Sequence, residues 1–160
     1  MGLDMYLYLE HYESKHHDYE HQENNVAGDF YPKELRTLGD KHIKHNFLSK
    51  ETKYQVGYWR KANAIHKWFV DYSNREDDCR DILVDKKALK DLRDICVKVK
   101  NDHSLAPMLL PTEDGFFFGS TEYGDWYFQD IDYTIDMLND VISFLDKNDH
   151  YWDCIYCASW

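Results

Sequence analysis

Residues 130–147 read DIDYTIDMLNDVISFLDK, and this stretch decides the fold that we predict for the chain. Its apolar residues recur every three or four positions, which is the period of an amphipathic helix. They form two adjacent stripes, so the helix is apolar over a wide arc and should lie at the centre of the core. The first stripe is Ile131, Ile135, Leu138, Ile142 and Leu145, and the second is Met137, Val141 and Phe144.

Two further segments, residues 57–73 and 85–101, show the same helical period. Asp85 is suited to cap the second of them, because an aspartate before the first turn accepts a bond from a free backbone N–H. In residues 57–73 one face is apolar and a neighbouring face is mixed. The apolar face is Tyr58, Ala62, Ile65, Phe69 and Tyr72, the mixed face is Trp59, Asn63, His66 and Val70, and residues 85–101 bury Leu89, Leu92, Cys96 and Val99.

Strands are predicted at both ends of the chain and in one aromatic stretch. Residues 4–12, DMYLYLEHY, alternate with period two, as do residues 151–159. The segments GFFFG (115–119) and DWYF (125–128) suit a hairpin joined by residues 120–124. The predicted fold class is therefore α+β, with three main helices packed on a small, mainly antiparallel sheet.

The length of 160 residues corresponds to a single domain. Residues 13–53 are polar and rich in His, Lys, Asp, Glu and Asn, so they are predicted to be a long insertion after the first strand, functioning as a lid or varying freely. Within the insertion we expect at most a short helix near residues 32–38.

The charge distribution limits the partners of the chain. Residues 101–160 contain twelve acids and one base, a net charge of 1 − 12 = −11, while residues 1–100 are balanced. Direct nucleic-acid binding is not expected, because phosphate contacts need a basic surface. No apolar run reaches the roughly 20 residues of a membrane span and no signal peptide is recognisable, which predicts a cytoplasmic protein without a membrane partner.

Two clusters are candidates for a ligand site. The segment at 59–66 combines an indole, two cations, an amide and an imidazole, which suits a flat anionic ligand such as a nucleotide. The segment at 119–126 adds hydroxyl groups and glycines that allow a close backbone approach. The predicted ligand-binding residues are Trp59, Arg60, Lys61, Asn63, His66, Ser120, Thr121, Glu122, Tyr123 and Trp126. The alternative is that these side chains only pack the core.

No catalytic motif is recognisable, and neither a catalytic residue nor a cofactor is predicted. His66 with Glu122 is a conceivable acid–base pair if the fold brings them together. Metal binding by the scattered histidines is an alternative that we do not adopt. The Cys154–Cys157 pair is interpreted as core or incidental cysteines because a structural zinc site needs a second pair, and metal or redox use is the alternative. The histidines in question are His11, His16, His17, His21, His42 and His45.

Three blocks of the sequence resemble a family of small proteins encoded by bacteriophages and prophages. The blocks are MGLDMYL (1–7), YWRKANAIHKWFV (58–70) and LPTEDGFFFGSTEYGDWYFQD (110–130). The resemblance implies a phage origin and the cytoplasm of an infected bacterium, but no reaction, because most members have no assigned function.

The leading hypothesis is a counter-defence protein that sequesters a nucleotide-derived immune signal, a cyclic ADP-ribose isomer or a cyclic oligonucleotide, without turnover. One alternative is an inhibitor that imitates nucleic acid with a carboxylate row against a host nuclease or polymerase. The other alternative is a nucleotide-cleaving enzyme that uses His66 and Glu122. A homo-oligomer is expected, since small binding proteins often build sites at subunit contacts. The carboxylate row is Asp130, Asp132, Asp136 and Asp140.

Overall fold

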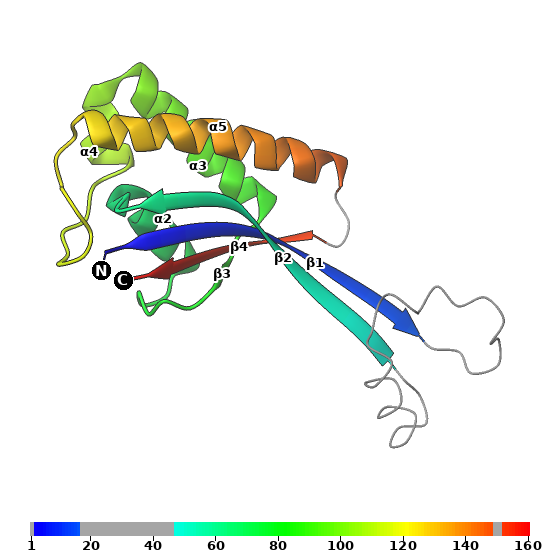
Figure 1. Ribbon diagram of the computed structural model, residues 1–160. Helices are drawn as coiled ribbons and strands as arrows, with labels where there is room; N and C mark the ends of the chain where they lie inside the picture. Colours follow the sequence, from blue (N-terminus) through cyan, green and yellow to red (C-terminus); the bar gives the residue numbers. More distant parts are fainter. Residues whose placement is uncertain (1, 17–46, 149–151) are drawn as a thin grey trace. The chain divides into compact units, whose positions relative to one another are not determined.

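The computed structural model describes residues 2–16, 47–148 and 152–160. They form an α+β fold, in which helices cover a four-stranded antiparallel sheet with the strand order β2-β1-β4-β3 (Figure 1). The strands are β1 (Asp4–His16), β2 (Phe47–Arg60), β3 (Ile82–Leu83) and β4 (Trp152–Ser159). The helices are α2 (Asn63–Ser73), α3 (Lys86–Asn101), α4 (Ala106–Leu109) and α5 (Asp125–Lys147), with a short 3-10 turn, η2 (His103–Leu105).

The chain divides into two compact units, one formed by Met1–Glu10 with Lys53–Trp160 and the other by His11–Thr52. The second unit has nearly the bounds of the predicted insertion, and its described part consists of the outer ends of β1 and β2. Residues 47–53 therefore belong to a strand rather than to an irregular segment, because backbone pairing does not depend on the polarity of the side chains. The helix predicted near residues 32–38 lies outside the described residues.

The core of the first unit lies between the sheet and the long helices. Over residues 4–9 of β1 the odd positions are buried and the even positions are half-buried, so one face of the strand is turned toward the helices. Helix α5 comes so close to β2 that a Cβ on Gly57 would lie 3.1 Å from Met137 Cε and 3.2 Å from Leu7 Cβ. Gly57 thus permits the close approach of helix and sheet. The buried odd positions are Met5, Leu7 and Leu9 of β1, together with Leu3 just before the strand.

Four predicted elements are confirmed. Strand β1 contains the predicted residues 4–12, and β4 covers the predicted strand except for position 151, which lies outside the described residues. Helix α3 begins as predicted, with the Asp85 carboxylate accepting a bond from the Ala88 backbone N–H at 2.7 Å. Helix α5 has the predicted apolar stripes buried, except for Phe144, which is half-buried. Among the described helices, none is both long enough and apolar enough to cross a bilayer.

The prediction of a helix over residues 57–73 is wrong for its first third. Residues 57–60 belong to β2, and the helix begins only at Asn63. Lys61, between the two elements, has a φ of 60° that neither element allows. The helical spacing of Tyr58 and Ala62 was coincidental, because the same stretch also alternates with period two and β1 offers it a pairing partner.

The predicted hairpin of residues 115–119 and 125–128 is also wrong. Residues 115–118 form a turn, in which the Phe118 N–H donates to the Gly115 carbonyl oxygen at 3.0 Å. The DWYF segment is the first turn of α5, which Gly124 precedes as N-cap. Tyr127 is buried there as part of a helical stripe that continues with Ile131, so α5 starts five residues before the predicted position.

Candidate functional site

A cavity of about 460 Å³ opens at the junction of three segments of the first unit. These are the β2–α2 connection, the loop of residues 110–124 and the first turns of α5. The volume lies within the range of small-molecule sites, roughly 300–1,000 Å³. Six of the ten predicted ligand-binding residues line this cavity. They are Arg60, Lys61, Asn63, Ser120, Glu122 and Trp126.

Trp59 does not line the cavity, although the sequence predicted it as the stacking ring. It lies on β2, where alternate side chains face the helices, and it is only 2% exposed. Its Nε1–H donates to Thr134 Oγ1 of α5 at 2.8 Å, and its ring meets Phe69 edge-on. Trp59 is therefore a core residue whose polar atom is satisfied inside the protein.

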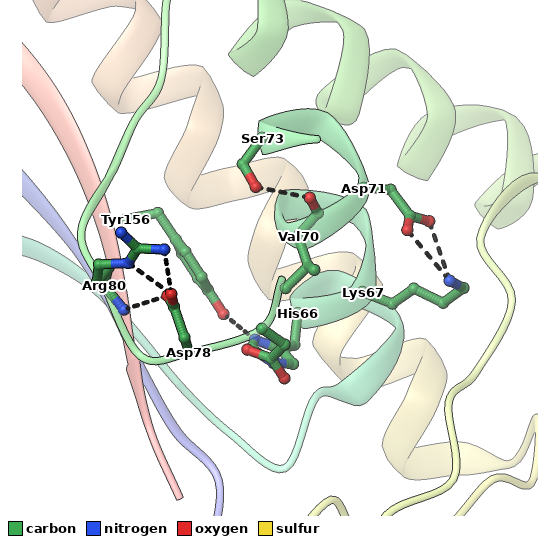
Figure 2. A network of polar contacts seen from close by, with 9 residues as sticks. His66, Lys67, Val70, Asp71, Ser73, Asp78, Arg80 and Tyr156 are labelled. Carbon is green, nitrogen blue, oxygen red and sulfur yellow. Dashed lines mark hydrogen bonds and ion pairs between the residues drawn. The ribbon is translucent and has the colours of Figure 1, made fainter. Parts of the chain in front are cut away.

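His66 is likewise turned into the core and does not line the cavity. It is 1% exposed, and both ring nitrogens have partners: Nδ1 lies 2.7 Å from the Tyr156 hydroxyl and Nε2 lies 2.9 Å from Asp77 Oδ2. Figure 2 shows the imidazole of α2 meeting Tyr156 of β4. Because a carboxylate only accepts, Nε2 carries a proton toward Asp77, and burial raises the pKa of Tyr156 well above its ordinary value. The structure does not pair His66 with Glu122.

Asn63 holds the loop that forms one wall of the cavity. Its Nδ2 donates to the carbonyl oxygens of Phe118 at 3.0 Å and Ser120 at 2.9 Å, and its Oδ1 accepts from the Glu113 N–H at 3.1 Å. The amide is thus fully used within the protein, and the side chain is 3% exposed. Asn63 shapes the cavity wall, and its polar atoms face the loop.

Thr121 and Tyr123 stay outside the cavity lining and fold the same loop onto itself. The Thr121 carbonyl oxygen accepts from Thr112 Oγ1 at 3.0 Å, and the Tyr123 hydroxyl accepts from the Thr112 N–H at 3.3 Å. These bonds connect the two ends of the loop, so Ser120 and Glu122 are presented at the cavity by a closed turn.

Two neighbouring cations, Arg60 and Lys61, stand at the cavity. The Arg60 side chain is 62% exposed, and its Nε is 4.0 Å from Asp4 Oδ1, which is the limit of an ion pair. The Lys61 stem passes beside Gly2 and Gly119; a Cβ on Gly119, whose φ is 90°, would lie 2.9 Å from Lys61 Cβ. In the part of the chain that the structure describes, no carboxylate pairs with Lys61. The Lys61 charge is therefore available to an anion, and the Arg60 guanidinium, held only by this long contact, can also reach one.

Helix α5 contributes an indole and a carboxyl group to the cavity. Trp126 and Asp130 are four residues apart, which places them on one helix face. The Trp126 side chain is 81% exposed. Burial raises the pKa of Asp130 to about 6. Asp130 was predicted only as part of a carboxylate row. Its i, i+4 spacing from Trp126 is the signal in the sequence that points to the cavity.

The carboxylate row on α5 is divided among different surroundings. Asp130 faces the cavity, and Asp132 forms an ion pair of 2.6 Å with Lys100. Asp136 and Asp140 are exposed beside a separate groove between α5 and the sheet. The row therefore leaves two carboxylates together for a basic partner.

The two cysteines of β4 are free thiols: Cys154 is buried, and Cys157 is partly exposed beside Asp81. Burial raises the pKa of Cys154 to about 12 and that of Cys157 to about 11, so both stay protonated at neutral pH. Within residues 2–16, 47–148 and 152–160, no three His, Cys, Asp or Glu side chains are grouped to hold a metal ion. Of the predicted metal candidates, His17, His21, His42 and His45 lie outside the described residues.

The raised pKa of Asp130 predicts a pH-dependent cost in stability. A folded-state pKa of about 6 against 3.8 means that this group stabilises the fold below about pH 4 and that the contribution is lost as the pH rises through 6. At pH 8 we expect Asp130→Asn to raise the free energy of unfolding by about 3 kcal/mol, with little effect at pH 4. Urea unfolding at both pH values measures this difference.

The matched control is Asp136→Asn, which neutralises an exposed carboxylate on the same helix. It removes one negative charge from the protein, as Asp130→Asn does, but it removes no desolvated carboxylate. Equal changes in the two variants across this pH range would contradict the assignment of a desolvated Asp130.

No protein-family model, no curated protein and no solved structure matches the chain.

Proposed function

We propose that the chain binds a nucleotide-derived anion in this cavity and holds it without turnover. The observation that carries the proposal is the pair of cations, Arg60 and Lys61, beside a cavity of about 460 Å³ in a chain of net charge −11. Lys61 has no carboxylate partner among the described residues, and the exposed Arg60 has only a 4.0 Å contact with Asp4, so the pair can attract phosphate, and an Arg–phosphate bond is charge-assisted.

Trp126 takes the stacking role that the sequence analysis gave to Trp59. An exposed indole is costly to leave in water and offers a face to a flat ring, worth about 1–3 kcal/mol per stacked base. The Ser120 hydroxyl group and the Glu122 carboxylate supply polar contacts for a sugar on the loop side. The lining therefore offers complementary groups for all three parts of a nucleotide.

Binding without turnover is supported by the place of His66. Its imidazole is sealed in the core with both nitrogens engaged, so it cannot transfer a proton to a guest in the cavity. The alternative of nucleotide cleavage by His66 and Glu122 therefore lacks a histidine that can act as the base.

The biological role we propose is sequestration of a nucleotide immune signal during phage infection of a bacterium. The resemblance to phage-encoded proteins and the anion-attracting cavity support this role together. Cyclic ADP-ribose isomers and cyclic oligonucleotides have the required chemistry, namely flat bases joined to phosphate groups. Their binding needs no catalytic apparatus.

Ligand screening by thermal shift tests the proposal. We expect one member of a panel of cyclic ADP-ribose isomers, cyclic dinucleotides and nucleoside monophosphates to stabilise the protein by about 2.7 kcal/mol at a hundredfold excess over its dissociation constant. Arg60→Gln and Lys61→Met should each lower the affinity for this ligand at least tenfold, because each removes one positive charge. Methionine is chosen at position 61 because it retains the apolar stem that lies on Gly2 and Gly119.

Lys87→Ala is the matched control, since this exposed lysine of α3 pairs with Asp91 and does not line the cavity. The bound ligand is then released by heat and analysed by mass spectrometry. Recovery of the unchanged nucleotide supports sequestration, whereas a cleaved product shows an enzyme. If no member of the panel shifts the melting curve, the proposed function is wrong.

A further inference from the structure

The Asp130 carboxyl group faces the cavity without a donor of its own. Among the described residues, no side chain or backbone N–H donates to it, and its backbone carbonyl oxygen, not its carboxylate, accepts from Thr134 Oγ1. Burial alone raises its pKa, and no neighbouring charge contributes. A half-buried carboxyl group that opens to the cavity and has no hydrogen-bond donor within the described protein is suited to a donor that arrives with a ligand.

The surroundings of Asp130 determine which part of a ligand it meets. The neighbouring wall is apolar and includes Ile65 and Ile131, so a ring rather than a solvated phosphate belongs there. Trp126 lies one helical turn before Asp130 on the same face, a rise of about 6 Å along the axis. A ring stacked on the indole therefore points an edge toward the carboxyl group.

The cations come from a different element of the site. Arg60 ends β2 and Lys61 follows it, whereas Trp126 and Asp130 are both on α5. One element thus offers positive charge to an anion, and the other offers an aromatic face and an acceptor. A phosphate beside Asp130 would meet like charge, so the base is the part that approaches α5.

A carboxylate selects among bases by the hydrogen atoms on their edges. Guanine presents two adjacent donors, N1–H and the 2-amino group, which match the two oxygens of a carboxylate. Hypoxanthine has only the N1–H, and adenine places the lone pair of N1 beside its amino group, where it would oppose the negative oxygen. A matched two-bond contact of this kind contributes about 1–3 kcal/mol of discrimination.

We infer that the cavity selects guanine nucleotides, with the Asp130 carboxylate accepting from N1–H and the 2-amino group, Trp126 stacking on the ring, and Arg60 and Lys61 binding the phosphate. The inference rests on the proposed function, since it assigns the base of the nucleotide that the cavity binds.

Calorimetric titration of the full chain with nucleotide pairs tests the inference. The probes are GMP, IMP and AMP, with cyclic di-GMP and cyclic di-AMP as a larger pair. At pH 7.5 we expect GMP to bind at least tenfold more tightly than IMP or AMP, and cyclic di-GMP more tightly than cyclic di-AMP. In Asp130→Asn, the affinity for GMP should fall to within threefold of that for IMP, because the amide presents a donor to N1–H.

Asp136→Asn is the matched control and should retain the full preference for GMP. Equal affinities of the wild-type protein for the members of each pair overturn the inference, and so does an Asp130→Asn protein that keeps the preference. If that variant does not fold, the wild-type titrations alone decide. Failure of all five probes overturns the inference, while the proposed function fails only if the whole nucleotide panel, including the cyclic ADP-ribose isomers, leaves the melting curve unchanged.

Discussion

Replacing Trp59 by alanine is expected to lower the free energy of unfolding by about 3–5 kcal/mol. The indole is among the largest fully buried side chains, and its removal leaves a cavity between β2, α2 and α5. The variant also loses the bond from Nε1–H to Thr134 Oγ1, a hydroxyl group buried at this contact. Chemical denaturation followed by circular dichroism measures the change.

Two further variants separate the causes. Trp59→Phe retains most of the volume and loses only the N–H bond, so it should cost about 1–2 kcal/mol. Trp126→Ala truncates an indole that is 81% exposed. It should keep the free energy of unfolding within about 0.5 kcal/mol of the wild-type value and lower the affinity for nucleotide instead. A Trp59→Ala protein of wild-type stability that no longer binds nucleotide would contradict the assignment of Trp59 to the core and of Trp126 to the ligand.

Asn63→Ala is expected to lower the free energy of unfolding by about 2–4 kcal/mol, because one substitution removes three hydrogen bonds and leaves backbone groups of the loop unsatisfied. The loop contributes Ser120 and Glu122 to the cavity, so nucleotide affinity should fall as well. Urea unfolding and calorimetric titration measure the two effects on the same preparation.

Ser120→Ala is the comparison for Asn63→Ala. The Ser120 hydroxyl group only accepts from the Glu122 N–H at an exposed position, 3.1 Å away, so its loss should cost under about 1 kcal/mol. Asn63→Asp should be at least as harmful as alanine, since a buried carboxylate would face two carbonyl oxygens. Wild-type stability in Asn63→Asp would contradict the hydrogen-bond pattern described for the loop.

The candidate site was predictable in part. Arg60, Lys61, Ser120 and Glu122 were predicted, because a cation pair and a Gly-Ser-Thr turn suit an anion, and they line the cavity, whereas Thr121 and Tyr123 do not. Of the two indoles predicted at the site, Trp126 lines the cavity but Trp59 does not, and Trp59 was placed there because residues 57–73 were interpreted as one helix. On a helix Trp59 would share a face with Asn63, but on β2 it shares a face with Gly57 and points into the core.

The sequence by itself determined the elements whose signals are local. The two apolar stripes of α5, the Asp85 cap of α3 and the alternation of β1 are each encoded within one segment, because helical period, capping and pleating involve neighbours in the chain. Only the tertiary structure decided where β2 ends and which side chains face the cavity. Pairing with β1 places residues 57–60 in a strand, although their spacing favours a helix. The close approach of α5 buries Trp59 and leaves Asp130 at the cavity. Such outcomes depend on partners distant in the sequence, and no local pattern contains them.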